Sequence, residues 1–119
     1  MKDKLEPNMY VRTKWGYICK IININDFREP NMKYGVEASY LRDVMFIGDD
    51  DVVKASYNII DLIEKNDYIN GSWVNKIVDG KPIHEDYNDP FYSFGWENDD
   101  IKTVITHEQI EQMAYKVVE

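Results

Sequence analysis

The clearest pattern of apolar and polar positions along the chain runs from Met9 to Ile24. β-Branched and aromatic residues fill both halves of this segment, and Lys14-Trp15-Gly16 separates them with a glycine at the bend. Two such runs around a glycine-containing turn predict a β-hairpin. Because neighbouring side chains of a strand point to opposite faces, the second arm is expected to place Ile18, Ile22 and Ile24 on one face and Cys19 and Ile21 on the other.

Turn-forming residues dominate the part of the chain that follows this hairpin. Asn25–Gly35 is rich in Asn, Asp, Pro and Gly and is therefore predicted to be a loop. A strand or a short irregular stretch is expected over Ser39–Ile47. The residues Gly48-Asp49-Asp50-Asp51 are expected to form a turn.

The segment Val52–Glu64 fits both a helix and a strand. Its length allows about three helical turns, but many of its apolar residues are β-branched. We therefore expect extended structure over Ile59–Ile63, while Val52–Tyr57 stays open between helix and strand.

A second hairpin is predicted over Asp67–Val78, because Asn70-Gly71 is a strong signal for a two-residue hairpin turn. Asp79-Gly80 supplies the next turn, ahead of Pro82-Ile83. The acidic and aromatic stretch Glu85–Asp100 is predicted to be a long loop or an edge hairpin. Ile101–Ile105 alternates as a strand does.

The C-terminal part carries the signature of a capped helix. Thr106 is followed three residues later by Gln109, the spacing of a capping box, which predicts one or two helical turns over His107–Met113. Ala114–Val118 is expected to be the last strand. The whole pattern predicts a mainly β fold with minor α, a small hairpin-built barrel or sandwich of SH3-like layout, as a single domain over residues 9–119 after a flexible lead-in over residues 1–8.

Composition limits the classes of function. The 119 residues include one cysteine, Cys19, which excludes an internal disulfide framework and indicates a core position in a reducing compartment. The N-terminal residues lack the apolar run of a signal peptide, and no stretch approaches the roughly 20 apolar residues of a membrane helix. A cytoplasmic protein without membrane contact is expected.

The charge balance is acidic. Fourteen basic and 22 acidic residues give a net charge of −8. Such a charge repels phosphate backbones and disfavours nucleic-acid binding, although it also serves solubility.

Neither histidine stands in a pattern that indicates catalysis. No nucleophile accompanies His84 or His107, and the phosphate-binding glycine motifs are absent. His84-Glu85-Asp86 with Asp89, and the Asp49–Asp51 run, hold oxygen ligands but lack the spacing of a calcium loop, and zinc favours more His or Cys. We therefore expect solvated turns, no metal, no cofactor and no enzymatic activity.

The stretch Asp79–Asp100 combines seven acidic residues and five aromatic ones with a single lysine. Its aromatic residues belong either to the core or to an interface in which they are anchors and the acids attract a basic partner. The candidate protein-binding residues are Asp49, Asp50, Asp51, Asp86, Asp89, Tyr92, Trp96, Glu97, Asp99 and Asp100.

Two other functions stay open. The first hairpin carries a local basic and aromatic set able to stack bases, which would suit a small nucleic-acid-binding barrel: Arg12, Lys14, Trp15, Tyr17 and Lys20. A structural or assembly role through strand-edge pairing is the other alternative. The oligomeric state does not follow from the sequence.

Two segments resemble small uncharacterised proteins of phages and prophages of low-GC Gram-positive bacteria. Asp61–Gly71 is similar to their DLIE-x-GDYVNG element, with Asn66 in place of Gly, and Ile105–Val117 is similar to their ITHEQ…M-x-Y-x-V ending. The resemblance brings no catalytic residue. It implies a protein that acts by binding a host protein with a basic surface, such as a Cas nuclease or another defence nuclease, in the manner of anti-CRISPR proteins that mimic DNA.

Overall fold

The computed structural model describes residues 4–25, 29–38, 42–86, 88–89, 93–114 and 117. Over these residues the chain forms eleven strands in three antiparallel sheets and one short α-helix, so the predicted mainly β fold is confirmed. No sheet among the described residues closes into a barrel, and the SH3-like layout is not confirmed. The chain divides into two compact units, Met1–Leu62 and Ile63–Glu119. The prediction of a single domain over residues 9–119 stays a prediction.

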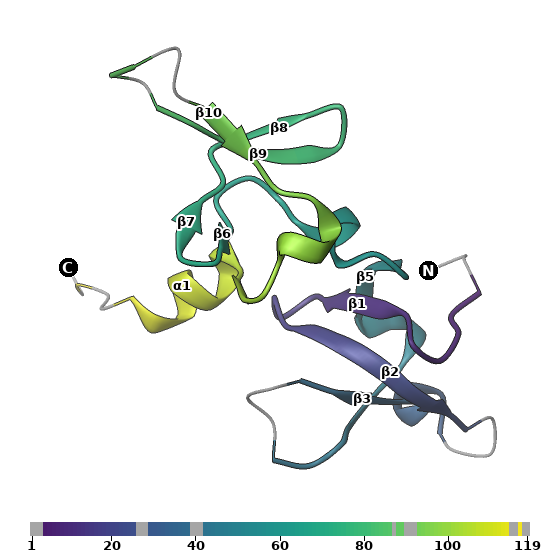
Figure 1. Cartoon of the computed structure of the whole chain (residues 1–119). Helices are drawn as coiled ribbons and strands as arrows, with labels where there is room; N and C mark the ends of the chain where they lie inside the picture. Colours follow the sequence, from purple (N-terminus) through teal and green to yellow (C-terminus); the bar gives the residue numbers. More distant parts are fainter. Residues whose placement is uncertain are drawn as a thin grey trace. The chain divides into compact units, whose positions relative to one another are not determined.

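The first unit contains a five-stranded sheet with the order β4-β3-β2-β1-β5 (Figure 1). Short 3-10 helices lie between β2 and β3, between β4 and β5, and after β5. The elements are β1 (Tyr10–Thr13), β2 (Ile18–Ile24), η1 (Pro30–Met32), β3 (Tyr34–Glu37), β4 (Met45–Ile47), η2 (Asp49–Asp51), β5 (Val52–Ser56) and η3 (Ile59–Leu62).

The first hairpin is confirmed, but one prediction about its faces is wrong. β1 and β2 pair antiparallel around a turn in which Gly16 has a φ of 86°. A bulge in β2 leaves Ile22 as an extra residue, because Ile21 pairs with Val36 and the next pair joins Asn23 to Gly35. The bulge reverses the alternation, so that Ile24 packs on the same core as Ile21 instead of the opposite face.

Several other boundaries in the first unit differ from the predictions. The loop predicted over Asn25–Gly35 ends earlier, since β3 begins at Tyr34 and pairs with β2. Residues 39–41 lie outside the described part of the predicted Ser39–Ile47 segment, and its strand covers Met45–Ile47. Val52–Ser56 is a strand, while Ile59–Leu62 is a 3-10 helix where extended structure was expected.

The core of the first unit draws on every strand of its sheet. Its buried residues are Leu5, Val11, Cys19, Ile21, Tyr34, Val36, Ile47 and Val52. Cys19 is therefore the core residue that the composition indicates. Leu5 is buried although it belongs to the predicted flexible lead-in over residues 1–8, whose mobility stays a prediction.

Gly48 lies where the two 3-10 helices η1 and η2 approach each other. A Cβ atom on it would lie 2.4 Å from the carbonyl oxygen of Pro30 and 2.7 Å from the Cα of Asn31. Its φ of −113° suits any residue, so the requirement for glycine comes from space and not from backbone conformation.

The second unit contains two three-stranded sheets, β10-β9-β8 and β11-β6-β7, followed by helix α1 (Figure 1). Most of its strands have only two or three residues. The elements are β6 (Tyr68–Ile69), β7 (Ser72–Trp73), β8 (Lys76–Val78), β9 (Lys81–Glu85), β10 (Ser93–Gly95), η4 (Asn98–Asp100), β11 (Val104–Ile105) and α1 (His107–Met113).

The second hairpin is confirmed around its predicted turn, but its predicted second arm is wrong beyond Trp73. β6 and β7 pair around the Asn70-Gly71 turn, but the chain leaves this sheet at Val74, and β8 pairs with β9 around Asp79-Gly80. Asn75 lies where the chain passes from the sheet of β6 and β7 to the sheet of β8 and β9. Its side-chain oxygen accepts a hydrogen bond from the Glu85 N–H at 2.8 Å, and its side-chain nitrogen donates to the Glu85 carbonyl at 2.6 Å. The side chain thereby replaces a backbone strand pair.

Other second-unit predictions have mixed outcomes. β10 pairs with β9, so the edge-hairpin interpretation of Glu85–Asp100 is confirmed for the described residues. The strand predicted over Ile101–Ile105 is shorter and begins at Val104. Helix α1 has the predicted bounds and the predicted Thr106 cap. Residues 115, 116 and 118 lie outside the described residues, and Ala114 and Val117 are not in a strand.

Candidate functional site

The Asp49–Asp51 run forms a tight acidic turn whose carboxylates have local partners. Asp51 accepts a hydrogen bond from the Gly48 N–H at 3.0 Å and pairs with the Lys14 Nζ at 3.0 Å. The hydrogen bond from Gly48 lowers the pKa of Asp51, the Lys14 charge lowers it further, and burial opposes both. Asp49 accepts a hydrogen bond from the Tyr34 hydroxyl at 2.6 Å, whereas Asp50 is exposed.

A second acidic turn in η4 repeats this construction. The Asp100 carboxylate accepts a hydrogen bond from the Glu97 N–H at 3.0 Å, as Asp51 does from Gly48. Glu97 and Asp99 are exposed. Each turn therefore uses its last aspartate to hold the backbone and presents its middle residue, Asp50 or Asp99, to solvent.

Asn70 holds the second acidic turn against the β6–β7 hairpin. Its side-chain oxygen accepts hydrogen bonds from the Lys102 and Thr103 N–H groups at 2.8 and 3.0 Å. Its side-chain nitrogen donates to the Asp100 carbonyl at 2.8 Å. The sequence marks Asn70 only as a turn residue, because the partners of its side chain are about thirty positions away in the chain.

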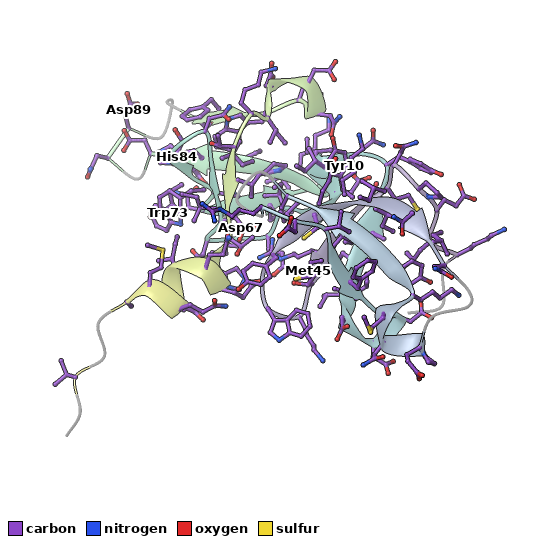
Figure 2. All side chains as sticks on the ribbon, turned by 90° about the horizontal axis from the view of Figure 1, so that it is seen from below. Tyr10, Met45, Asp67, Trp73, His84 and Asp89 are labelled. Carbon is purple, nitrogen blue, oxygen red and sulfur yellow. The ribbon has the colours of Figure 1, made fainter. Side chains whose placement is uncertain are left out.

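The remaining predicted site residues differ in burial and in their contacts. Asp86 accepts a hydrogen bond from the Asn88 N–H at 2.9 Å, and Asp89 is exposed (Figure 2). Tyr92 lies outside the described residues. Trp96 is 8% exposed and belongs to the second core with Ile63, Ile69 and Val74. Its ring is therefore buried, where a partner cannot use it as a surface anchor.

The division into two units separates the predicted acidic residues into two groups. Asp49–Asp51 belong to the first unit, and the others belong to the second. The sequence of the first unit holds nine basic and ten acidic residues, a net charge of −1. The second unit holds five basic and twelve acidic residues, a net charge of −7. Almost all of the excess negative charge is therefore carried by the second unit.

The basic and aromatic set of the first hairpin is incomplete at the surface. Arg12 is 1% exposed, and its Nη1 donates a hydrogen bond to the Leu62 carbonyl at 3.0 Å. Lys14 is engaged by Asp51 and lies 5.0 Å from the centre of the Trp15 ring. A nucleic-acid-binding surface on this hairpin could therefore not use the buried Arg12 guanidinium, and the charge of Lys14 is already paired with Asp51.

His84 contacts a backbone carbonyl and an aromatic ring. Its Nδ1 lies 2.8 Å from the carbonyl oxygen of Trp73 (Figure 2). The centre of its ring lies 5.2 Å from that of Phe94, and the two ring planes are tilted by 34°. Glu85 pairs with the Lys76 Nζ at 3.3 Å. The arrangement orients the imidazole toward the backbone, and among the described residues no set of metal ligands converges on it.

The other histidine lies between carboxylates. The Nε2 of His107 is 3.1 Å from Glu64 Oε1 and 2.5 Å from Glu108 Oε1. Glu64, His107 and Glu108 are the only group of three or more His, Cys, Asp or Glu in the described part of the chain whose potential ligand atoms converge within 4.8 Å. All three side chains are partly exposed, at 30%, 31% and 24%.

Asp67 fixes the backbone on both sides of this cluster. It is fully buried; one carboxylate oxygen accepts the Glu64 N–H at 2.7 Å and the other accepts the His107 N–H at 2.9 Å (Figure 2). A single side chain thus joins the segment before β6 to the start of α1. The sequence contains both ends of this arrangement, but nothing local brings Glu64 and His107 together across 43 positions.

Comparison with protein-family models, with curated proteins and with solved structures finds no match to this chain. Within the described residues, no helix has the length and apolar character needed to cross a membrane.

Proposed function

We propose that this chain is a non-catalytic protein that binds a basic surface of another protein through exposed carboxylates of its second unit. The observation that carries the proposal is the separation of charge, −7 in the second unit against −1 in the first. Solubility alone would not require the excess acidic residues to be concentrated in one half of the chain. A concentrated one attracts a basic partner and excludes phosphate backbones.

The second acidic turn supports the proposal with a defined geometry. Asp100 and Asn70 hold its backbone by hydrogen bonds, so that Glu97 and Asp99 project from a fixed turn. A turn whose backbone is already held loses less conformational entropy on binding than a free loop does. The exposed residues Asp89, Glu97 and Asp99 are the proposed contacts.

The resemblance to phage proteins indicates which partner to test first. We propose the DNA-binding groove of a host defence nuclease, as in anti-CRISPR inhibition, because such a groove is lined with cations that normally contact phosphates. The test measures binding of the purified chain to purified Cas nucleases of low-GC Gram-positive bacteria, and inhibition of DNA cleavage, at low and at physiological salt.

Charge reversal at matched positions makes this test specific. Glu97→Lys combined with Asp99→Lys is expected to weaken binding at least about fivefold at low salt, with a smaller effect at high salt. Asp50→Lys is the matched control for Asp99→Lys alone, because Asp50 has the same middle position in the equivalent turn of the nearly neutral unit. Equal loss in both variants, or no loss in either, would contradict binding through the second unit.

A further inference from the structure

The cluster of Glu64, His107 and Glu108 presents three electron-pair donors to one small volume. Both carboxylate oxygens face the same ring nitrogen, Nε2 of His107. With a neutral imidazole the three groups have a charge of −2, and they lie in the unit that already holds the negative charge. A divalent cation would neutralise this cluster.

We propose that Glu64, His107 and Glu108 form a binding site for a divalent transition metal of the zinc class. One imidazole and two carboxylates are a ligand set that zinc accepts, and three protein ligands leave a position open for water. The inference is independent of the proposed function, since it needs neither the acidic turns nor a partner protein.

The distances fit a site that is nearly assembled. Zinc bonds of about 2.0–2.2 Å at tetrahedral angles place neighbouring ligand atoms about 3.3 Å apart. His107 Nε2 and Glu64 Oε1 are 3.1 Å apart, which is close to this value. Glu108 Oε1, at 2.5 Å from Nε2, is at hydrogen-bond distance and would have to move about 0.8 Å away from Nε2 to reach the spacing of zinc ligands.

Two features outside the ligand set favour the same conclusion. Metal-binding histidines usually donate their second ring N–H to a carboxylate or carbonyl, and Nδ1 of His107 lies 3.9 Å from the Glu111 Oε1 atom. The buried Asp67 holds the two ligand-bearing segments through their N–H groups. The ligands therefore do not have to be gathered from a flexible chain when the metal binds.

The experiment titrates the untagged full chain, stripped with a chelator, with Zn²⁺ by calorimetry and with Co²⁺ by visible absorption. We expect one Zn²⁺ per chain, a Co²⁺ spectrum of low coordination number, and no competition from equal Mg²⁺ or Ca²⁺, which favour oxygen-only sites. Zinc is also expected to raise the midpoint of thermal unfolding, because it joins the segment before β6 to α1.

The chain contains a matched control, because it has only two histidines. His107→Gln is expected to weaken Zn²⁺ binding by more than about tenfold, and His84→Gln to leave it unchanged. Glu108→Gln gives a second loss of affinity if His107→Gln does not fold. Failure of the wild-type chain to take up Zn²⁺ or Co²⁺, or equal affinity in the His107→Gln and wild-type proteins, would overturn the proposal.

Discussion

At the residue scale, Asp67 has an unusual position for a carboxylate. It is fully buried, and its two oxygens accept the N–H groups of Glu64 and His107. Charged side chains are rarely buried unless hydrogen bonds replace the lost water. Asp67 is therefore the residue on which the junction between the β6 segment and α1 depends.

Replacing Asp67 should lower the free energy of unfolding more than replacing an exposed aspartate does. Asp67→Ala removes the acceptor of two partly buried N–H groups, and each unsatisfied group costs about 1–3 kcal/mol. We expect the free energy of unfolding to fall by about 3 kcal/mol or more, measured by urea denaturation. Asp50→Ala, at an exposed position, should change it by less than about 0.5 kcal/mol. Similar losses in both variants would show that Asp67 is not a structural carboxylate.

At the scale of elements, local signals predicted more than distant ones. The Lys14-Trp15-Gly16 and Asn70-Gly71 turns and the Thr106 capping box each lie within a few residues, and all three appear where the sequence places them. Asn66 has a φ of 78°, a region that glycine and asparagine tolerate best.

The elements that the sequence did not predict depend on distant partners. The bulge at Ile22 arises from pairing with β3, and the break after Trp73 arises because Asn75 pairs with Glu85 through its side chain. The β-branched residues of Ile59–Leu62 favoured a strand, yet this segment is a 3-10 helix whose Leu62 carbonyl receives the Arg12 guanidinium. Tertiary contacts override propensity at such places.

In the candidate site too, features made of contiguous residues were predicted and features that join distant residues were not. Composition and sequence located the acidic turns, because their residues are contiguous. The assignment of Trp96 to a core, and the meeting of Glu64 with His107, depend on how strands far apart in sequence are arranged.

The acidic turn η2 should make stability depend on pH at the acid end. Asp51 has a pKa below its usual 3.8 in the folded chain, so its stabilising effect is complete above 3.8 and is lost as the pH falls through the folded value. Asp51→Asn is expected to lower the free energy of unfolding by about 1 kcal/mol at neutral pH. The difference from wild type should narrow at about pH 3.

Urea denaturation at both pH values measures this effect, with Asp50→Asn as the control for loss of an exposed charge. A difference between Asp51→Asn and wild type that stays constant down to about pH 3 would show that the Asp51 carboxylate has no such linkage.

At the scale of the whole molecule, the unequal charge of the two units should appear in their response to salt. Repulsion among the excess carboxylates of the second unit opposes its folding, and salt screens charges beyond about 8–10 Å at physiological ionic strength. We expect hydrogen exchange of amides in residues 63–119 to slow as sodium chloride rises from about 0.02 to 0.5 M, with less change in residues 1–62.

Mass spectrometry of peptic peptides measures both units in one sample, so the first unit is the internal control. A chelator keeps metal from contributing. If salt slows hydrogen exchange equally in the two units, their unequal net charges do not produce unequal electrostatic repulsion.

The close approach at Gly48 has a consequence for how this sequence can diverge. Gly71 and Gly80 have positive φ angles but open space around them, so that asparagine could replace either one over evolutionary time. Gly48 has an ordinary φ and no space, since even one methyl group would collide with the backbone of η1. Among descendants of a common ancestor, position 48 should therefore be invariant, and its glycine would identify distant relatives better than the turn glycines do.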